Sequence, residues 1–104
     1  SRGIAAIEEE NRRKAALLYD EIDRNPLFST SVKKEDRSMM NICFRAVDER
    51  TGEMFNDFCT ETGIVNIKGH RSTGGFRASL YNAVSLEDVK YVVAAMQEFE
   101  TTNK

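Results

Sequence analysis

Residues 68–81 read KGHRSTGGFRASLY, and the pattern in this segment indicates two strands with a loop between them. Residues 69–75 are polar and carry three glycines, which is typical of a loop. The second half of the segment alternates and places three apolar residues on one face of a strand: Phe76, Ala78 and Leu80. A short apolar segment at 64–68 precedes the loop. The pattern therefore predicts two strands, at 64–68 and 76–81, joined by a polar loop.

Upstream of this stretch, the sequence predicts more extended structure and a short helix. Residues 39–47 alternate with period two, and four apolar residues share one face: Met40, Ile42, Phe44 and Ala46. Apolar residues return at helical spacing over 54–59, and Gly63 follows at the position of a left-handed C-terminal cap. A Ser/Thr-rich extended stretch at 27–32 and a charged turn at 33–37 come before the alternating strand.

Long helices are predicted at both ends of the chain. Residues 4–22 have helical spacing, and three glutamates precede a cation by four positions: Glu8/Arg12, Glu9/Arg13 and Glu10/Lys14. Pro26 ends this helix, whose polar middle predicts a connector that is not wholly buried. Ser85 and Asp88 form a capping box for the last helix. Its apolar stripe is Leu86, Val89, Val92, Val93, Met96 and Phe99, and a polar tail at 101–104 follows.

These elements predict an α+β fold. A small antiparallel or mixed sheet is covered on one face by two helices and is preceded by the long connector helix. The 104 residues are 40% hydrophobic and 31% charged, a composition that suits one globular domain. We predict that residues 1–25 form the connector and residues 26–104 the small domain.

Charge and cysteine content exclude several classes of function. The 15 basic and 17 acidic residues give a net charge of −2, so no global positive field exists to hold nucleic acid or an anionic membrane. No apolar run is long enough to span a membrane or form a signal core, which predicts a soluble, cytoplasmic protein. Cys43 and Cys59 lie in apolar segments without metal or disulfide spacing, which predicts buried thiols and no metal site.

Residues 68–77 also hold candidate functional groups, with four potential cations in ten residues: Lys68, His70, Arg71 and Arg77. Arginine forks match carboxylate or phosphate oxygens, and glycines allow close approach of a ligand. Because Arg71 lies in the loop and Arg77 on a strand, the two guanidiniums suit two anionic groups of one small ligand. His70 is a candidate general base and Lys68 a candidate Schiff-base lysine. The alternative is an ordinary solvated hairpin turn.

The residues also resemble a known family. The block KGHRSTGGFRASLYNA at 68–83, with LEDV at 86–89 and MQEF at 96–99, is similar to the C-terminal part of phosphoserine aminotransferases. The segment SMMNICF at 38–44 resembles the strand before the small-domain helix of that family. The resemblance covers residues 17–100, and it places the chain among class V aminotransferases of the pyridoxal-phosphate fold type I.

The resemblance implies the C-terminal small domain of an aspartate-aminotransferase-like enzyme. Such an enzyme uses pyridoxal 5'-phosphate to transfer an amino group between glutamate and 3-phosphohydroxypyruvate, which gives O-phospho-L-serine and 2-oxoglutarate in serine biosynthesis. By position, Arg77 is similar to the arginine that holds the substrate α-carboxylate. Arg71, with His70 beside it, resembles the residues that receive the substrate phosphate or the γ-carboxylate of glutamate.

The sequence lacks residues that the whole enzymes of this family use to bind the cofactor. The cofactor-binding residues of the family belong to a large upstream domain, and Lys68 does not match the Schiff-base lysine. The resemblance therefore implies a chain that is inactive alone and that acts with its large domain in a homodimer. Ser85 and Asp88 replace the more usual proline and glycine, and both cap the last helix. The rival interpretation is a non-catalytic α+β module that binds a small anionic metabolite or a protein partner.

Overall fold

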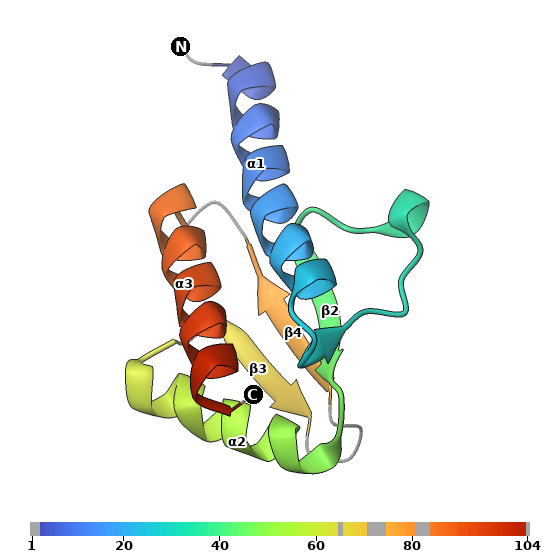
Figure 1. The fold of residues 1–104 in the computed structure, drawn as a ribbon. Helices are drawn as coiled ribbons and strands as arrows, with labels where there is room; N and C mark the ends of the chain where they lie inside the picture. Colours follow the sequence, from blue (N-terminus) through green and yellow to red (C-terminus); the bar gives the residue numbers. More distant parts are fainter. Residues whose placement is uncertain (1–2, 65, 71–74, 81–83, 104) are drawn as a thin grey trace.

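The chain forms a four-stranded sheet with three helices (Figure 1). The computed structural model describes residues 3–64, 66–70, 75–80 and 84–103. The predicted α+β class is confirmed. In chain order, the elements are α1 (Gly3–Arg24), β1 (Phe28–Ser29), a 3-10 turn (Lys34–Asp36), β2 (Asn41–Ala46), α2 (Glu49–Thr62), β3 (Ile67–His70), β4 (Gly75–Ser79) and α3 (Leu86–Asn103).

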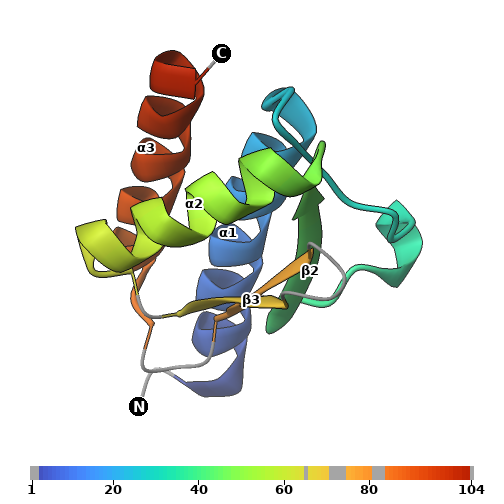
Figure 2. The same cartoon turned by 90° about the horizontal axis from the view of Figure 1, so that it is seen from below.

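The sheet is antiparallel throughout, in the order β1-β2-β4-β3. Its register aligns apolar residues across the inner face, since Ala78 pairs with Ile42 on one side and with Ile67 on the other. The predicted faces of β2 and β4 are confirmed: Ile42, Phe44, Phe76, Ala78 and Leu80 are buried. This inner face packs against the helices (Figure 2).

Three helices cover that face, one more than the sequence predicts. Beside α2 and α3, the C-terminal half of α1 packs into the core through Ala15, Leu18 and Ile22, and α1 runs next to α3 (Figure 1). The N-terminal half stays exposed and projects beyond the sheet, with Ile4 75% and Ile7 47% exposed. In the part of the chain that is described, no helix is both long and apolar enough to cross a membrane.

The core is built around an aromatic cluster that contains all six phenylalanines of the chain. Phe55 of α2 is fully buried at its centre. Its ring centroid lies 4.8 Å from that of Phe28, 5.1 Å from that of Phe99 and 5.2 Å from that of Phe76, all in edge-to-face geometry. Such contacts stabilise a core beyond the area that they bury. The cluster joins β1, β2, β4, α2 and α3 into one unit.

Local signals fix the helix ends. The predicted capping box is present, because the Ser85 amide donates to Asp88 at 2.9 Å and the Asp88 amide donates to the Ser85 hydroxyl at 3.1 Å. Gly63 has a φ of 78°, the left-handed conformation that was predicted. The α3 helix extends into the predicted polar tail, where Thr101 and Thr102 donate their hydroxyls to carbonyls one turn back.

The strand boundaries differ from the predictions: β2 is Asn41–Ala46 rather than 39–47, β4 is Gly75–Ser79 rather than 76–81, and β3 starts later than residue 64. The amide of Ile64 donates to the Cys59 carbonyl at 2.9 Å, and that of Gly63 donates to the Thr60 carbonyl at 3.3 Å. This pattern is a Schellman motif, which commits Ile64 to the end of α2. The strand β3 therefore begins at Ile67 rather than at residue 64.

The charged side of α1 also differs in part from the prediction. Glu9 pairs with Arg13 at 3.8 Å, as spacing suggests, and with Arg12 at 2.8 Å. Lys14 instead turns inward and is 1% exposed. Its Nζ donates to the carbonyls of Leu80 at 3.3 Å and Val84 at 2.8 Å. The lysine thus ties the end of β4 and the start of α3 to α1.

A buried polar network fastens α1 to α3. Glu21 is 3% exposed and accepts hydrogen bonds from Arg24 at 2.7 Å, Asn25 at 3.0 Å and Gln97 at 3.3 Å. Arg24 also donates to Glu100 at 2.7 Å. Burial alone would raise the pKa of Glu21, but these donors outweigh it and hold the pKa below its usual value. Folding therefore favours the ionised carboxylate.

This network predicts acid sensitivity. Because the pKa of Glu21 is lower in the folded chain than in the unfolded chain, its stabilising contribution is full above the unfolded pKa and is lost as pH falls through the folded pKa. We expect Glu21→Gln to lower the free energy of unfolding at pH 7 by about 1–3 kcal/mol. Urea denaturation from pH 7 to pH 3 should show the two proteins converging at acid pH. A difference that stays constant across this range would contradict the assignment.

Candidate functional site

The face of the sheet that the helices leave uncovered is basic. It carries the exposed residues Cys43 and Arg45 of β2, Lys68 of β3 and Arg77 of β4. The strands contain no Asp or Glu, because all 17 acidic residues of the chain lie in helices, turns and loops. We call this surface the open face. It is locally positive although the chain has a net charge of −2.

The register places the charges in two rows across the open face. Arg77 pairs with Cys43 on one side and with Lys68 on the other. In the next row, Gly75 pairs with Arg45 and with His70. Like charges directly opposite on neighbouring strands repel each other, as Lys68 and Arg77 do here. A bound anion would relieve that repulsion, so the arrangement favours anion binding at Arg77.

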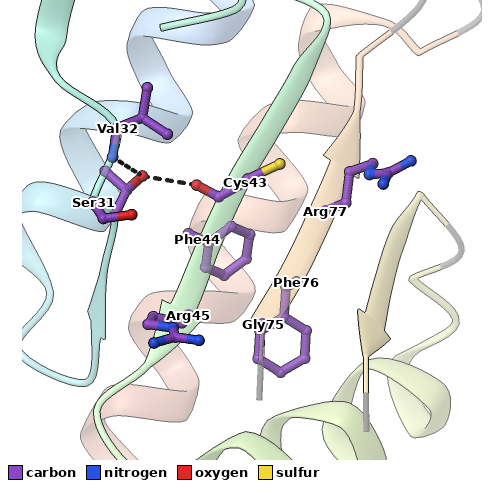
Figure 3. A pocket seen from close by; sticks show the side chains of 9 residues that line it. Ser31, Val32, Cys43, Phe44, Arg45, Gly75, Phe76 and Arg77 are labelled. Carbon is purple, nitrogen blue, oxygen red and sulfur yellow. Dashed lines mark hydrogen bonds between the residues drawn. The ribbon is translucent and has the colours of Figure 1, made fainter. Parts of the chain in front are cut away.

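A cavity of about 330 Å³ opens beside Arg77 on this face (Figure 3). One wall is the segment 30–32, which is held against β2 because the Thr30 hydroxyl donates to the Cys43 carbonyl at 2.8 Å. The Val32 amide in turn donates to that hydroxyl at 3.3 Å. The described lining contains two guanidiniums and no carboxylate. It consists of Thr30, Ser31, Val32, Cys43, Phe44, Arg45, Gly75, Phe76 and Arg77.

The segment that follows this wall is fastened to α1. Arg37 donates to both carboxylate oxygens of Asp23, at 3.1 and 3.0 Å, and its guanidinium lies 4.5 Å from the ring centroid of Tyr19. The Tyr19 hydroxyl donates to the Ser38 carbonyl at 2.8 Å. Bidentate pairing and stacking on an aromatic ring both restrict an arginine. These contacts fix the position of the chain that follows the cavity wall.

The predicted site residues have different outcomes. Arg77 lies on the open face and lines the cavity. The backbone of His70 ends β3, opposite Gly75. Arg71 lies outside the described residues, so its place at a second anionic group stays a prediction. The antiparallel pairing of β3 with β4 confirms the predicted hairpin. Both the anion-site interpretation and the solvated-turn alternative expect this hairpin, so the pairing does not decide between them.

The prediction of two buried thiols is wrong for one of them. Cys59 is 4% exposed, and burial raises the pKa of its thiol to about 12. Cys43 is exposed, because the residues on either side of it in β2 face the core and it must therefore face the other way. The alternation of β2 in the sequence already predicts that Cys43 is exposed. The same alternation predicts that Arg45 is exposed beside it, although Arg45 was not among the candidate site residues.

Comparison with known proteins gives this geometry a context. Residues 1–92 match the family model for class-V aminotransferases. The chain is 55% identical to the phosphoserine aminotransferase of Parabacteroides distasonis over 100 aligned residues, and this alignment covers 94% of the chain. It is 46% identical over 102 residues to that of Bacillus cereus, which covers 98% of the chain. In both comparisons the chain spans only 28% of the relative's length.

Solved structures agree with the sequence comparisons. A phosphoserine aminotransferase from Bacillus circulans subsp. alkalophilus superposes with a TM-score of 0.91 at 39% identity, over 98% of this chain and 28% of that one. A phosphoserine aminotransferase from Trichomonas vaginalis, described as bound to pyridoxal phosphate, gives 0.81 at 42% identity, over 91% of this chain and 28% of that one. The chain belongs to the class-V aminotransferase family.

Proposed function

We propose that this chain is the C-terminal substrate-recognition part of a phosphoserine aminotransferase. The whole enzyme would transfer an amino group between glutamate and 3-phosphohydroxypyruvate. The observation that carries the proposal is Arg77, which lies on a strand without acidic residues and lines a cavity together with a second arginine. The relatives named as phosphoserine aminotransferases support the choice of reaction.

Arg77 holds the α-carboxylate in this proposal. Every substrate of the reaction carries an α-carboxylate, and a planar guanidinium binds both oxygens of a carboxylate in a fixed orientation. Each substrate also carries a second anionic group, a phosphate or a γ-carboxylate, which we assign to Arg71 and His70. Anchoring both ends fixes the orientation of the reacting carbon, and such positioning contributes much of the rate of an enzyme.

The described residues of this chain do not suit the pyridoxal-phosphate ring itself. The cofactor needs a lysine for its Schiff base and an acidic or basic partner at the pyridine nitrogen. Within the described cavity lining there is neither a lysine nor a carboxylate. Lys14 is buried at the end of β4, on carbonyl oxygens. We therefore assign the cofactor to the rest of the enzyme and the substrate anions to this chain.

The remaining organisation follows from the same proposal. Residues 1–25 connect the domain of residues 26–104 to a large domain, and the exposed Ile4 and Ile7 suit a contact there. The enzyme would act as a cytoplasmic homodimer. These assignments rest on the family resemblance and on the solvated N-terminal half of α1.

The test is glutamate-dependent transamination of 3-phosphohydroxypyruvate by the longer protein that carries this chain. The quantity measured is the 2-oxoglutarate that the reaction forms. Turnover with pyridoxal phosphate is the expected result. If the protein in its native source has the mass of this chain alone, 11.8 kDa, and still binds phosphoserine, the proposal fails. The chain would then be a non-catalytic module for a small anionic metabolite.

A further inference from the structure

The segment of residues 30–40, which links β1 to β2, is held by polar contacts rather than by the core. We call this segment the strap. All of its residues are described, and none of them is buried. In Figure 1 it forms a wide loop that stands clear of the sheet. Because a segment without buried apolar contacts opens locally at low free-energy cost, its position depends on the side chains that fasten it.

The strap is fastened near both of its ends. At its start, the Thr30 hydroxyl donates to the Cys43 carbonyl of β2 at 2.8 Å. Near its far end, Arg37 donates to both carboxylate oxygens of Asp23 on α1 and stacks on the Tyr19 ring. The Arg37 side chain is 15% exposed. A bidentate pair and a stacked ring fix both the distance and the orientation of a guanidinium, so Arg37 sets where the strap lies on α1.

The 3-10 turn at Lys34–Asp36 connects Arg37 to the cavity wall. The Asp36 amide donates to the Lys33 carbonyl at 2.9 Å, and the Arg37 amide donates to the Lys34 carbonyl at 3.4 Å. Because the turn is hydrogen-bonded internally, a shift of Arg37 is passed to residues 30–32. In Figure 3 these wall residues lie on one side of β2, and Arg77 lies on the other.

Stability alone gives little reason for the Arg37 contact. The Asp23 side chain is 42% exposed, and ion pairs with an exposed partner contribute little to the free energy of unfolding. Among the described residues, the buried Nε of Arg37 has no hydrogen-bond acceptor, which offsets part of that contribution. The contact therefore fixes a position more than it stabilises the fold.

We propose that Arg37 is a positioning residue for the substrate site. This inference rests on the proposed function and deepens it. By fastening the strap to α1, Arg37 holds the wall at 30–32 at a fixed distance from Arg77. A substrate whose carboxylate lies on Arg77 then meets a wall that is already in place, and binding is spared the cost of ordering it. Arg37 acts through the strap and does not touch the substrate.

Kinetics of the longer enzyme test this role. We would measure kcat and KM for 3-phosphohydroxypyruvate in the wild type, Arg37→Met, Arg37→Lys and Asp23→Ala. Lys90→Met also breaks an exposed ion pair, on α3 and away from the strap, and is the matched control. We expect Arg37→Met to raise KM about 3- to 10-fold and to change kcat less than about twofold, because the ordering cost affects the bound ground state and the transition state alike. Asp23→Ala should have the same effect, the double variant should add nothing, and Arg37→Lys should recover part of the loss.

Two further measurements separate positioning from a general loss of structure. The midpoint of thermal unfolding of Arg37→Met should stay within about 2 °C of the wild-type value. Deuterium uptake by peptides of the strap, measured by mass spectrometry, should rise in Arg37→Met and not in Lys90→Met. If Arg37→Met does not fold, Asp23→Ala decides by the same criteria.

The possible failures are distinguishable. An active wild type with an unchanged KM in Arg37→Met, or a rise in KM that Lys90→Met shares, would overturn the role of Arg37. A wild-type enzyme without transaminase activity would overturn the proposed function, and with it the part that Arg37 plays in that reaction.

Discussion

Replacement of Arg77 by alanine should reduce kcat/KM of the full enzyme by about two to three orders of magnitude, for amino-acid and keto-acid substrates alike. All of these substrates present the same α-carboxylate, so the loss should not depend on their second anionic group. Truncating one partner of a desolvated, hydrogen-bonded charge pair costs about 2–5 kcal/mol, and each 1.36 kcal/mol is about tenfold in rate. The measurement is steady-state kinetics of both half-reactions.

Stability provides the control for Arg77. The side chain is exposed on the open face and lies beside another cation, Lys68. Its removal should leave the midpoint of thermal unfolding within about 2 °C of the wild-type value, since surface substitutions are nearly neutral. Arg77→Lys should retain the charge but not the bidentate geometry, and should regain only part of the activity. Unchanged kinetics in Arg77→Ala would refute its assignment to the carboxylate.

Replacement of Phe55 by alanine should have the largest effect on folding. The side chain is fully buried, and its ring meets those of Phe28, Phe76 and Phe99 within 5.2 Å. Truncating such a phenylalanine costs about 3–5 kcal/mol, because the cavity adds to the lost transfer free energy. A domain of this size has about 5–15 kcal/mol in total. Urea denaturation followed by circular dichroism should therefore show a free energy of unfolding that is about 3–5 kcal/mol below that of the wild type, a large share of the total.

Two further variants keep the Phe55 prediction testable if the alanine protein does not fold. Phe55→Leu retains most of the volume and should lose about half as much stability as the alanine variant. Met54→Ala changes the neighbouring residue on α2, which is 37% exposed, and should lose less than about 1 kcal/mol. A similar loss at positions 54 and 55 would contradict the central place of Phe55 in the core.

Local patterns predicted those parts of the fold that depend on neighbours in sequence. The faces of β2 and β4 follow from alternation, and the ends of α2 and α3 follow from Gly63 and the Ser85 capping box. Lys14 shows where this reasoning stops. Its spacing from Glu10 suits a surface pair, but the carbonyls that it contacts belong to residues 80 and 84, which only the tertiary fold brings near.

The candidate site also has parts that the sequence predicts and parts that only the tertiary fold shows. Arg77 stands out in the sequence because it follows a glycine-rich loop and resembles a family motif. Arg45 has no such motif, and its place beside the same cavity appears only when β2 pairs with β4. The wall at 30–32 was expected to be extended, but its closeness to Arg77 depends on the Thr30 hydrogen bond to β2. Long-range register supplies what spacing along the chain cannot.

The molecule is positive on the open face of the sheet and negative along the outer side of α2. Cations lie on the open face, whereas Glu49, Glu53, Asp57 and Glu61 line up at four-residue spacing along the exposed side of α2. The result is an electric dipole that turns the positive end toward an approaching anion and repels it from the helical side. Electrostatic steering of this kind raises association rates and weakens as salt shortens the Debye length. Capture of substrate should thus be faster at low ionic strength, even though protein and ligand are both negatively charged overall.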